Sequence, residues 1–553
     1  MNLANLGKAG LQVAQDRLQT TGHNINNAAT PGYSRQAVIA QSAGATSTSA
    51  GWVGRGVVAV SVQRSYDTFL SQQLNDSQSR SAALTSYGNQ IGQINNLVAD
   101  RTVGISPAIQ KFFDSLDAVA SAPADVAARQ DLIGQANSLS TQIRNANAFL
   151  DSQRQNVNTQ VSTTVSQINS YLSRIQDVNK QLATAGATTP GQPPNDLLDQ
   201  RDQLVNELGQ LVDIKTYAQG DQISITTGNG QTLLGGNTVF PLQAQPSVAD
   251  PGRLAISYTM TGADGQLQTV EMPEGAITGG QLGGLLKFRA DALDSVQNDL
   301  GRIALGISVA VNQQHTQGVD LSGAQGGALF DVGTPTVIDN ARNVSQGAPK
   351  ASYTPGGLSQ ITDQDYRVQY DGSGYVVTQM PSGTAVAPVV DATAHTLSFD
   401  GVTLDVTGLA PVAGDTWTVQ PTRNAAQHMD VLITDPSKIA AAASGAGTAN
   451  GDNALKLAAL RTDKVLGNGS MGLNEAYSQL VNNVAVKTQQ NTTAQKAQDT
   501  LVQQNTAAQQ GVSGVNLDEE YINLQQYQEQ YQAAARLINT ASTLFDTLLG
   551  LRS

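Results

Sequence analysis

The two ends of the chain carry an apolar pattern that repeats every seven residues. Near the start, one line of this pattern runs through Leu11, Leu18 and Ile25. A second pattern begins at Leu517 and holds its register to Leu548, almost to the last residue. Such a repeat is typical of helices that pack along a narrow seam against other helices. Any fold of this chain must therefore pair its two ends with each other or with other chains.

Small residues fill the second line of the N-terminal seam. Gly7, Ala14 and Thr21 each lie three residues after a member of the first line. Small side chains let two helix axes approach closely, so the ends are predicted to pair as a coiled-coil core. The C-terminal seam is predicted to consist of two lines with the same spacing: Leu517, Leu524, Tyr531, Ile538 and Phe545, and then Tyr527, Ala534, Ala541 and Leu548.

Neither seam is expected to be stable in an isolated chain. Burying a large apolar side chain stabilises by about 1.5–3 kcal/mol, whereas ordering the backbone costs roughly 1–2 kcal/mol per residue. Lone helices of this length, rich in Asn, Gln, Ser and Thr, are marginal in water. We therefore expect the residues before Gly32 and after Val515 to become ordered only when subunits assemble.

The first helix is predicted to end in a turn that is part of the assembly site. Asn26 belongs to an Asn-rich stretch, and Thr30, Pro31 and Gly32 follow it. Proline cannot continue a helix, and glycine adopts backbone angles that other residues avoid. The turn is predicted to set the angle between the terminal helix and the next layer of the molecule.

Three side chains around this turn are interpreted as structural. Tyr33 offers an apolar ring with a polar tip, and Arg35 offers a planar fork of donors. His23 lies in the Asn-rich helix end, where a hydrogen-bonded cap or interface role is favoured over that of a catalytic base. We expect Tyr33 and Arg35 to hold the exit of the helix in place.

Helical and β-rich segments alternate between the two ends. "YSRQAVIAQ" and "GVVAVSVQRSY" predict two strands joined by a Gly/Ser/Thr-rich loop. Helix is predicted from Tyr66 onward and, as a very long segment, from about Asp125 to Leu182. The predicted fold class is therefore α+β and multidomain, with a helical bundle and one or two small inserted β-rich domains. The predicted division is 1–40 with 510–553 for the terminal coiled coil; 41–205, 276–330 and 450–509 for the bundle with its hairpin; 206–275, 331–345 and 422–449 for one β-rich domain; and 346–421 for an outer β-rich insertion.

Composition argues against several classes of partner. The 553 residues include 31 Lys and Arg against 44 Asp and Glu, so a nucleic-acid surface is not expected. No dense basic run suits an anionic membrane, and no apolar run approaches the roughly 18 residues that span a bilayer. The start does not have the pattern of a Sec signal peptide. The absence of Cys excludes disulfides and thiolate chemistry.

No motif predicts a catalytic, cofactor or metal site. "GNGSMG" has the spacing G-x-G-x-x-G, but the residues before it are predicted to be helical, so a loop between helices is favoured over a dinucleotide site. The four histidines do not form the zinc-protease pattern H-E-x-x-H. Asp363 and Asp365 have no complete calcium loop after them, which favours a solvated turn. We predict that the chain is not an enzyme and needs no cofactor.

Several stretches resemble one known family. "NNAATPGYSRQ" is similar to the N-terminal motif of the bacterial flagellar axial proteins, which include rod, hook and hook-associated proteins. "GVNLDEEYINLQQYQEQYQAAARLINTASTLFDTLLGL" resembles the matching C-terminal motif, and "FFDSLDAVASAPADVAARQ" resembles an internal stretch. The chain is identified as a member of this family. "GYSRQ" and the length favour a member that joins the hook to the filament.

The resemblance implies a structural, non-enzymatic function outside the cell. It implies export through the flagellar type III channel, with a cytoplasmic chaperone on the C-terminal segment. It further implies self-assembly into a short tubular zone, with the hook protein below and a second junction protein above. The region from about Thr334 to Pro421 carries no family motif. We expect this region to be peripheral, and its excision from about Ser345 to leave filament assembly working.

Three alternatives stay open at this point. Within the family, the chain could be another hook-type axial protein. Outside it, the β-rich regions could make it an adhesin, in which case ligand binding would survive removal of both seams. An inserted region could also carry an enzyme such as a wall hydrolase, which zymography would detect.

Overall fold

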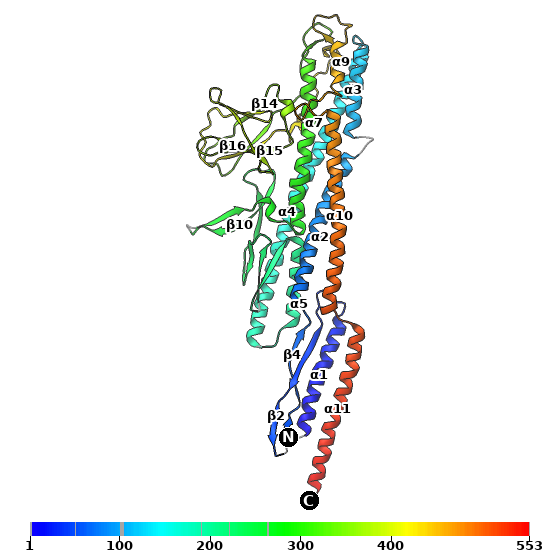
Figure 1. The fold of residues 1–553 in the computed structure, drawn as a ribbon, viewed down its shortest axis with the longest axis vertical. Helices are drawn as coiled ribbons and strands as arrows, with labels where there is room; N and C mark the ends of the chain where they lie inside the picture. Colours follow the sequence, from blue (N-terminus) through cyan, green and yellow to red (C-terminus); the bar gives the residue numbers. More distant parts are fainter. Residues whose placement is uncertain are drawn as a thin grey trace.

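The molecule is an elongated rod with small β sheets attached along one side (Figure 1). The computed structural model describes residues 3–49, 51–99, 104–189, 191–220, 222–262 and 265–551. Helices run along the long axis, and both described chain ends lie at one end of it (Figure 1). The predicted α+β multidomain class is confirmed.

The rod is a bundle of long helices that bury one continuous apolar core. The predicted long helix is confirmed as α4, and Val161, Ile168, Ile175 and Leu182, which are spaced seven residues apart along it, are buried in that core. Asp125 caps the start of α4 by accepting a hydrogen bond from the Ala127 N–H. The helices of the bundle are α2 (Thr68–Val98), α3 (Ile105–Ser121), α4 (Val126–Thr188), α5 (Asn195–Leu211), α6 (Gly280–Phe288), α7 (Asp294–His315), α8 (Ala425–His428), α9 (Asp452–Ala459) and α10 (Leu473–Ser513).

Short elements join these helices. A π-helical turn, η2 (Arg289–Leu293), links α6 to α7, and the 3₁₀ turns η1 (Glu274–Ala276) and η4 (Pro436–Lys438) lie in loops. The strands β12 (Gly318–Val319) and β22 (Ala442–Ala443) pair near the far end of the rod. The "GNGSMG" stretch lies between α9 and α10, as the loop reading predicted.

The predicted N-terminal hairpin is confirmed as a two-stranded antiparallel ribbon. Its strands are β1 (Gln36–Ser42) and β4 (Val57–Arg64), with a bulge between Ile39 and Ala40. The loop between them forms a second small hairpin, β2 (Ala45–Thr48) and β3 (Gly51–Gly54). One face of the ribbon packs on the first helix, where a Cβ atom added at Gly56 would lie 3.1 Å from Leu6 Cδ1.

The first inserted β region consists of two small sheets that lie against α4. Their apolar residues, including Ile225, Leu234 and Ile256, belong to the same buried cluster as the helices of the rod. These sheets therefore share the core of the bundle. The strands are β5 (Ile214–Gln219), β6 (Gln222–Thr227), β7 (Thr232–Gly235) and β8 (Thr238–Val239) in one sheet, and β9 (Leu242–Pro246), β10 (Leu254–Thr261) and β11 (Leu267–Glu271) in the other.

The second inserted region, residues 336–420, is a separate body that we call the outer body. Its two antiparallel sheets enclose their own apolar cluster around Tyr366, Phe399 and Trp417. The 3₁₀ turn η3 (Leu358–Gln360) lies within it. The strands are β13 (Thr336–Asp339), β21 (Thr416–Gln420), β15 (Asp365–Tyr370), β16 (Tyr375–Met380) and β17 (Ala385–Val386) in one sheet, and β14 (Lys350–Tyr353), β20 (Val402–Asp405), β19 (Thr396–Phe399) and β18 (Val389–Asp391) in the other.

The terminal helices pair with each other at the lower end of the rod in Figure 1. They are α1 (Leu3–Asn27) and α11 (Leu517–Gly550), which we call the terminal pair. They run antiparallel, since Gly7 faces Ile538 and Asn24 faces Glu520. The predicted pairing of the two ends is confirmed.

Candidate assembly site

The terminal pair is held together mainly through small residues. A Cβ atom added at Gly7 would lie 2.7 Å from Ile538 Cγ1, and one added at Gly10 would lie 3.5 Å from Ala534 Cβ. Ala14 and Ala541 are buried in the same contact. The small residues of the second line, Gly7, Ala14, Ala534 and Ala541, therefore form most of the contact together with Gly10 and Ile538, and their small size lets the helices approach closely.

The larger side chains of both seams are much less covered. The side chains of Leu11, Leu18 and Ile25 on α1 are only partly buried, as are those of Leu524, Tyr527 and Ile538 on α11. Ile538 contacts Gly7 and the other five flank the contact, whereas Leu517, Tyr531, Phe545 and Leu548 are exposed to 54, 38, 59 and 66%.

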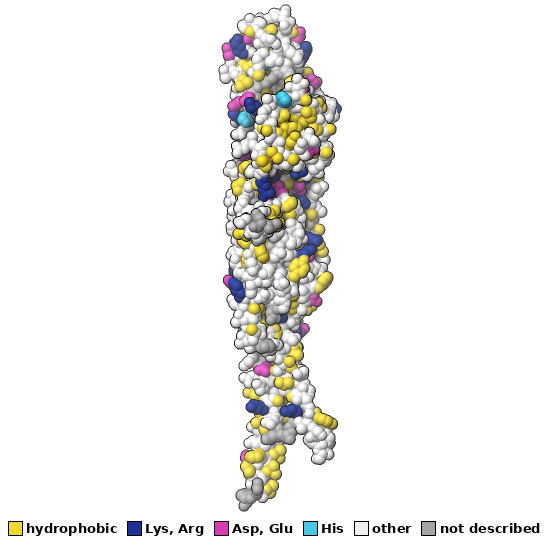
Figure 2. Space-filling view, turned by 90° about the vertical axis from the view of Figure 1, so that its left-hand side faces the viewer, with side chains coloured by type: hydrophobic (Ala, Val, Ile, Leu, Met, Phe, Trp, Pro, Cys, Tyr) yellow, Lys and Arg dark blue, Asp and Glu magenta, His cyan; other side chains and the backbone are white. Residues whose placement is uncertain are grey.

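The register of the pair explains the exposed residues at the end of α11. Because Gly7 faces Ile538, the described start of α1 at Leu3 is reached near Ala541. The last turns of α11 therefore extend past α1. Within one chain they have no covering element among the described residues, and apolar side chains gather at this tip (Figure 2). The exposed large apolar residues of α11 are Leu517, Tyr521, Ile522, Tyr531, Leu537, Leu544, Phe545, Leu548 and Leu549, and the exposed Leu551 follows the helix.

The turn after α1 is built around Asn24, whose side chain satisfies all its hydrogen-bonding groups. Its Oδ1 accepts from the Tyr33 hydroxyl at 2.7 Å and from the Gln36 N–H at 2.9 Å. Its Nδ2 donates to Gln36 O at 2.9 Å and to Glu520 Oε2 at 3.1 Å. Asn24 is 2% exposed. One amide thus joins the end of α1, the start of β1 and the start of α11, a role that neither Asp nor Leu can fill.

Arg35 fixes the start of α11 to the same turn. Its Nε donates to Glu520 Oε1 at 2.8 Å and its Nη1 donates to Glu519 Oε2 at 3.0 Å. The Arg35 N–H also donates to Ser513 O, at the end of α10. Glu520 is 1% exposed, so its charge is compensated in a nearly dry position. We call Asn24, Tyr33, Arg35 and Glu520 the turn cluster.

A second set of contacts ties the turn to α5. The Ser34 N–H donates to Asp199 Oδ2 at 2.9 Å, and Arg64 on β4 pairs with Asp199 Oδ1 at 2.8 Å. Burial raises the pKa of Asp199 even though these donors oppose the rise. Burial also raises the pKa of the Tyr33 phenol, with Asp196, Asp199 and Glu520 adding to the effect. Tyr33 therefore stays protonated as a donor.

Gly32 and His23 have different parts in this turn. Gly32 has a φ of +78°, and a Cβ atom there would lie 2.8 Å from Gln203 Oε1. His23 Nδ1 lies 3.0 Å from the Tyr33 hydroxyl oxygen. Since the hydroxyl proton is donated to Asn24, Nδ1 must carry the proton of that contact. His23 is thus a peripheral hydrogen-bonding residue, whereas Gly32 is required by the backbone.

Asn26 and Thr30 lie outside the buried part of the turn. Both are exposed, and Thr30 Oγ1 donates to Asn27 Oδ1 at 3.2 Å. The sequence analysis predicted Asn26 as the assembly residue of this stretch, but the structure buries Asn24 instead. The helical period gives the reason: Asn24 lies three residues beyond the buried Thr21, on the face that meets α11.

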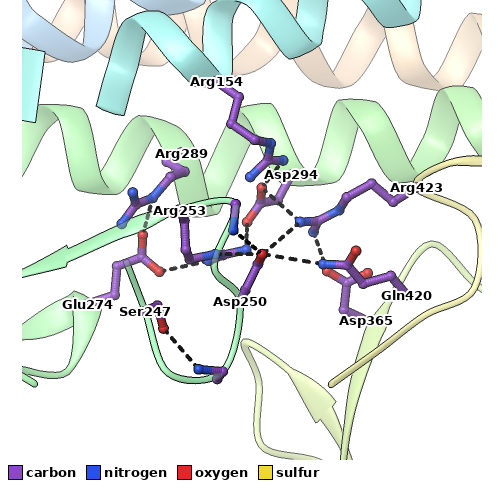
Figure 3. A network of polar contacts seen from close by, with 12 residues as sticks. Arg154, Ser247, Asp250, Arg253, Glu274, Arg289, Asp294, Asp365, Gln420 and Arg423 are labelled. Atoms are coloured by element: carbon purple, nitrogen blue, oxygen red, sulfur yellow. Dashed lines mark hydrogen bonds and ion pairs between the residues drawn. The ribbon is translucent and has the colours of Figure 1, made fainter. Parts of the chain in front are cut away.

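A second cluster of polar residues, far from the terminal pair, attaches the outer body to the rod (Figure 3). Arg253 donates to Asp294 at 3.0 Å and to Asp250 and Glu274 at 3.1 Å. We call this cluster the charge network. It consists of four arginines (Arg154, Arg253, Arg289 and Arg423) and four carboxylates (Asp250, Glu274, Asp294 and Asp365).

Two members of the charge network link the outer body to α7. Arg423, just after β21, pairs with Asp365 on β15 and lies 3.6 Å from Asp294 Oδ1 on α7. Burial would raise the pKa of Asp294, but Arg423, Arg253 and Arg154 together hold that pKa well below its ordinary value. Asp294 is therefore ionised at neutral pH and fixes the position of three arginines.

Sequence reasoning missed Asn24, Glu520 and the whole charge network. Glu520 had a partial signal, because Asn516 caps α11 and an acidic first turn follows it. The rest of the network had none, since its members are scattered from Arg154 to Arg423 and meet only in the fold. The prediction that Asp365 lies in a solvated turn was wrong, because Asp365 is buried on β15 and pairs with Arg423.

Neither cluster has the composition of a reaction centre. In the described ranges, no group of three or more His, Cys, Asp or Glu residues is placed to hold a metal ion. No helix in the described part of the chain is both long and apolar enough to cross a bilayer. The carboxylates of both clusters are engaged by arginines and backbone donors. Both clusters position structural elements.

Three family descriptions match successive parts of the chain. "Flagellar hook-associated protein FlgK helical domain" matches residues 91–330. "Flagellar hook-associated protein 1, D2-like domain" matches residues 338–421, nearly the outer body. "Flagellar basal body rod FlgEFG protein C-terminal" matches residues 509–551, which contain α11.

Curated relatives and a solved structure agree with these matches. The chain is 38% identical over 553 residues to flagellar hook-associated protein 1 of Escherichia coli (strain K12), with all of both chains covered. It is 25% identical to the protein of that name from Bacillus subtilis (strain 168), covering 98% of this chain and 96% of the relative. The structure of the flagellar hook junction protein FlgK from Burkholderia pseudomallei matches with a TM-score of 0.74 and 30% identity, over 80% of this chain and all of that one.

Proposed function

Because the chain belongs to the family of flagellar hook-associated protein 1 and is a structural component of the hook–filament junction, we propose that its terminal pair is the part that builds the junction. Copies of the chain would assemble side by side into a short tubular zone. The observation that carries this proposal is the apolar surface of α11, which the other described residues leave exposed.

The burial pattern supports a contact between subunits. α11 covers its small residues with α1 but leaves Tyr531, Leu537, Phe545 and Leu548 exposed. Large apolar side chains gathered in an exposed position along one helix mark an interaction surface. Contacts between unlike faces of neighbouring copies generate rings or helical tubes. The assembly residues proposed from the sequence fit this picture as flanking or exposed positions.

The finer partners follow from the place of the family in the flagellum. We propose that the tubular zone has the hook protein below it and a second junction protein above it. The exposed C-terminal face would be covered by a cytoplasmic chaperone before export and by neighbouring subunits afterwards. The mature protein would lie outside the cell, as part of the axial structure.

The outer body is proposed to be a peripheral domain with little part in assembly. It has its own core and lies to one side of the rod (Figure 1). The domain division expected from the sequence remains our proposal, with one adjustment. Because β13 pairs with β21, the boundary of the outer body is placed at Thr336 instead of residue 346.

Electron microscopy of cells that lack this chain tests the proposed function. We expect hooks without filaments and flagellin released into the medium, with recovery when the wild-type chain is supplied. A variant truncated before α11 should be made but should not restore filaments. Normal filaments in cells without the chain would refute the proposal.

A further inference from the structure

The lower half of α10, toward the terminal pair, is joined to α2 differently from the upper half. In the upper half, Leu473, Tyr477, Leu480 and Val484 are buried in the core of the rod. After Val484, no apolar side chain of α10 is buried, and α10 is described along its whole length. The change lies within one straight helix at the edge of the rod (Figure 1).

The line of positions that carries the apolar contacts continues downward as amides. Tyr477 and Val484 are followed at the same seven-residue spacing by Asn491, Gln498 and Asn505. We call these three residues the amide ladder. A packed helix would ordinarily place apolar residues at such positions. The ladder therefore replaces the apolar contact over three successive repeats.

Each amide of the ladder donates to a backbone carbonyl of α2. Asn491 Nδ2 lies 3.0 Å from Leu84 O, Gln498 Nε2 lies 3.0 Å from Ser77 O, and Asn505 Nδ2 lies 3.3 Å from Gln73 O. These carbonyls already accept the hydrogen bonds of their own helix, so water can take the place of the partly exposed Gln498 and Asn505 amides at small cost. Asn491, at the top of the ladder, is buried.

Two further observations favour access of water to this contact. A cavity of about 490 Å³ lies beside it, lined by polar residues such as Gln78, Ser81 and Gln160, with Val502 from α10. The other bonds between the two helices are also polar, from Ser81 to Asp499 at 2.8 Å and from Gln495 to Thr85 at 3.0 Å. Polar contacts of this kind separate more easily than buried apolar ones.

We infer that the lower half of α10 is conformationally flexible and separates transiently from α2, while the upper half stays packed against the core. Its upper end is fixed by the core at Val484, and its lower end is fixed at Ser513, whose carbonyl accepts from the Arg35 N–H. Between these points the helix is held by exchangeable hydrogen bonds. The rod is thus flexible beside the terminal pair and rigid beside the outer body.

Hydrogen exchange on the purified full chain tests the inference. Amides at 488–510 should exchange faster than those at 476–486. Replacing the ladder by leucine (Asn491→Leu, Gln498→Leu and Asn505→Leu) extends the apolar line and should slow exchange at 488–510 by roughly tenfold or more, because each buried leucine resists opening. The matched control is Asn483→Leu, Gln490→Leu and Gln504→Leu, three exposed amides of the same helix, which should leave the rates unchanged.

Two results would overturn the inference. Equal protection above and below Val484 in the wild-type chain would mean that the amides lock the helices together. An equal slowing of exchange in the ladder variant and the control variant would mean that helix propensity, and not the contact with α2, sets the opening rate. Neither result depends on whether the chain assembles at the junction.

Discussion

The charge network and the terminal pair are two ways of joining distant parts of one chain. In the charge network four arginines meet four carboxylates, and Asp294 alone contacts Arg154, Arg253 and Arg423. In the terminal pair, the glycines of α1 lie closest to Ile538 and Ala534 of α11, and large side chains such as Phe545 and Leu548 are exposed. The first contact pairs its charges within the chain, with only Arg154 Nη1 of the network left as a buried donor without a hydrogen-bond partner among the described residues, whereas the second leaves most of its apolar surface uncovered.

This difference indicates which contact is made for other subunits. Charges buried in a network fix a geometry, and they need no further partner once all are compensated. An uncovered apolar face gains most of its stabilisation only when another surface meets it. Predictions that disturb the two regions should therefore separate folding from assembly.

The largest effect is expected from charges placed in the terminal pair. Leu524→Asp and Ile538→Asp each put an unpaired carboxylate beside the α1 contact, where burial of a charge is strongly unfavourable. Both variants should fail to form filaments, while circular dichroism shows the rod still folded. Gln532→Asp, at an exposed polar position of α11, is the control and should assemble normally. Filament formation by either seam variant would contradict the assembly role.

A large difference in protection is expected between the ends and the rod. In a verified monomer, residues 4–28 and 517–548 should exchange their amide hydrogens rapidly, because the terminal pair lacks the burial that subunit contacts supply. The apolar core of α4 should be strongly protected. Hydrogen exchange followed by mass spectrometry measures both. Strong protection throughout the two terminal segments would show that the pair is stable without neighbours.

Loss of one carboxylate from the charge network should destabilise folding. Asp294→Asn keeps the shape but leaves three arginines with one fewer charge partner, at a cost of about 3–5 kcal/mol in the free energy of unfolding. Asp114→Asn, in an exposed pair with Arg461, should cost below about 1 kcal/mol. Urea unfolding of both variants measures the difference.

The pH dependence of stability gives a second measure of the same site. The pKa of Asp294 is lowered in the folded chain, so its contribution is present above the unfolded value of about 4 and is lost as the pH falls below it. The free energy of unfolding of Asp294→Asn should therefore fall less between neutral and acidic pH than that of the wild-type chain. Equal costs for Asp294→Asn and Asp114→Asn, or an unchanged acid loss, would show that the network does not hold the rod and outer body together.

Sequence reasoning predicted the elements that depend on local pattern. The seven-residue repeats predicted the terminal pair, and the alternating stretches predicted the ribbon of β1 and β4. The long helix α4 followed from the same periodicity. These features were accessible because helix and strand periods are visible in one segment at a time.

The remaining features depend on contacts between distant segments. The seven-residue repeat does not indicate which of its residues form the contact within one chain. In the structure the small residues form it, and Leu517 and Phe545 do not, because the choice depends on the register of α1 against α11. Asn24 and Arg423 could not be singled out, since their partners lie hundreds of residues away or on other elements. Polar clusters of this kind leave no periodic signal in the sequence.

A moderate effect is expected from the turn after α1. Pro31→Ala with Gly32→Ala should reduce incorporation into the junction, because alanine at a φ of +78° is strained by about 1–2 kcal/mol and would contact Gln203. His23→Ala removes one peripheral hydrogen bond to Tyr33 and should have a smaller effect. Filaments per cell, corrected for the exported amount of each variant, provide the measure. A more severe His23→Ala phenotype would refute this account of the turn.

The smallest effect on assembly is expected from removal of the outer body. Thr336 and Gln420 are partners on neighbouring strands, so their backbones lie close together and a short linker can replace residues 336–420. The cut removes Asp365 from the charge network, leaving four arginines with three carboxylates. Combining it with Arg423→Gln restores the balance of charge. The doubly altered chain should therefore be more stable to urea than the deletion alone, and both should support filaments at near wild-type numbers. Loss of filaments from the balanced, exported and folded deletion would show that the outer body, like the terminal pair, is completed by a neighbouring subunit.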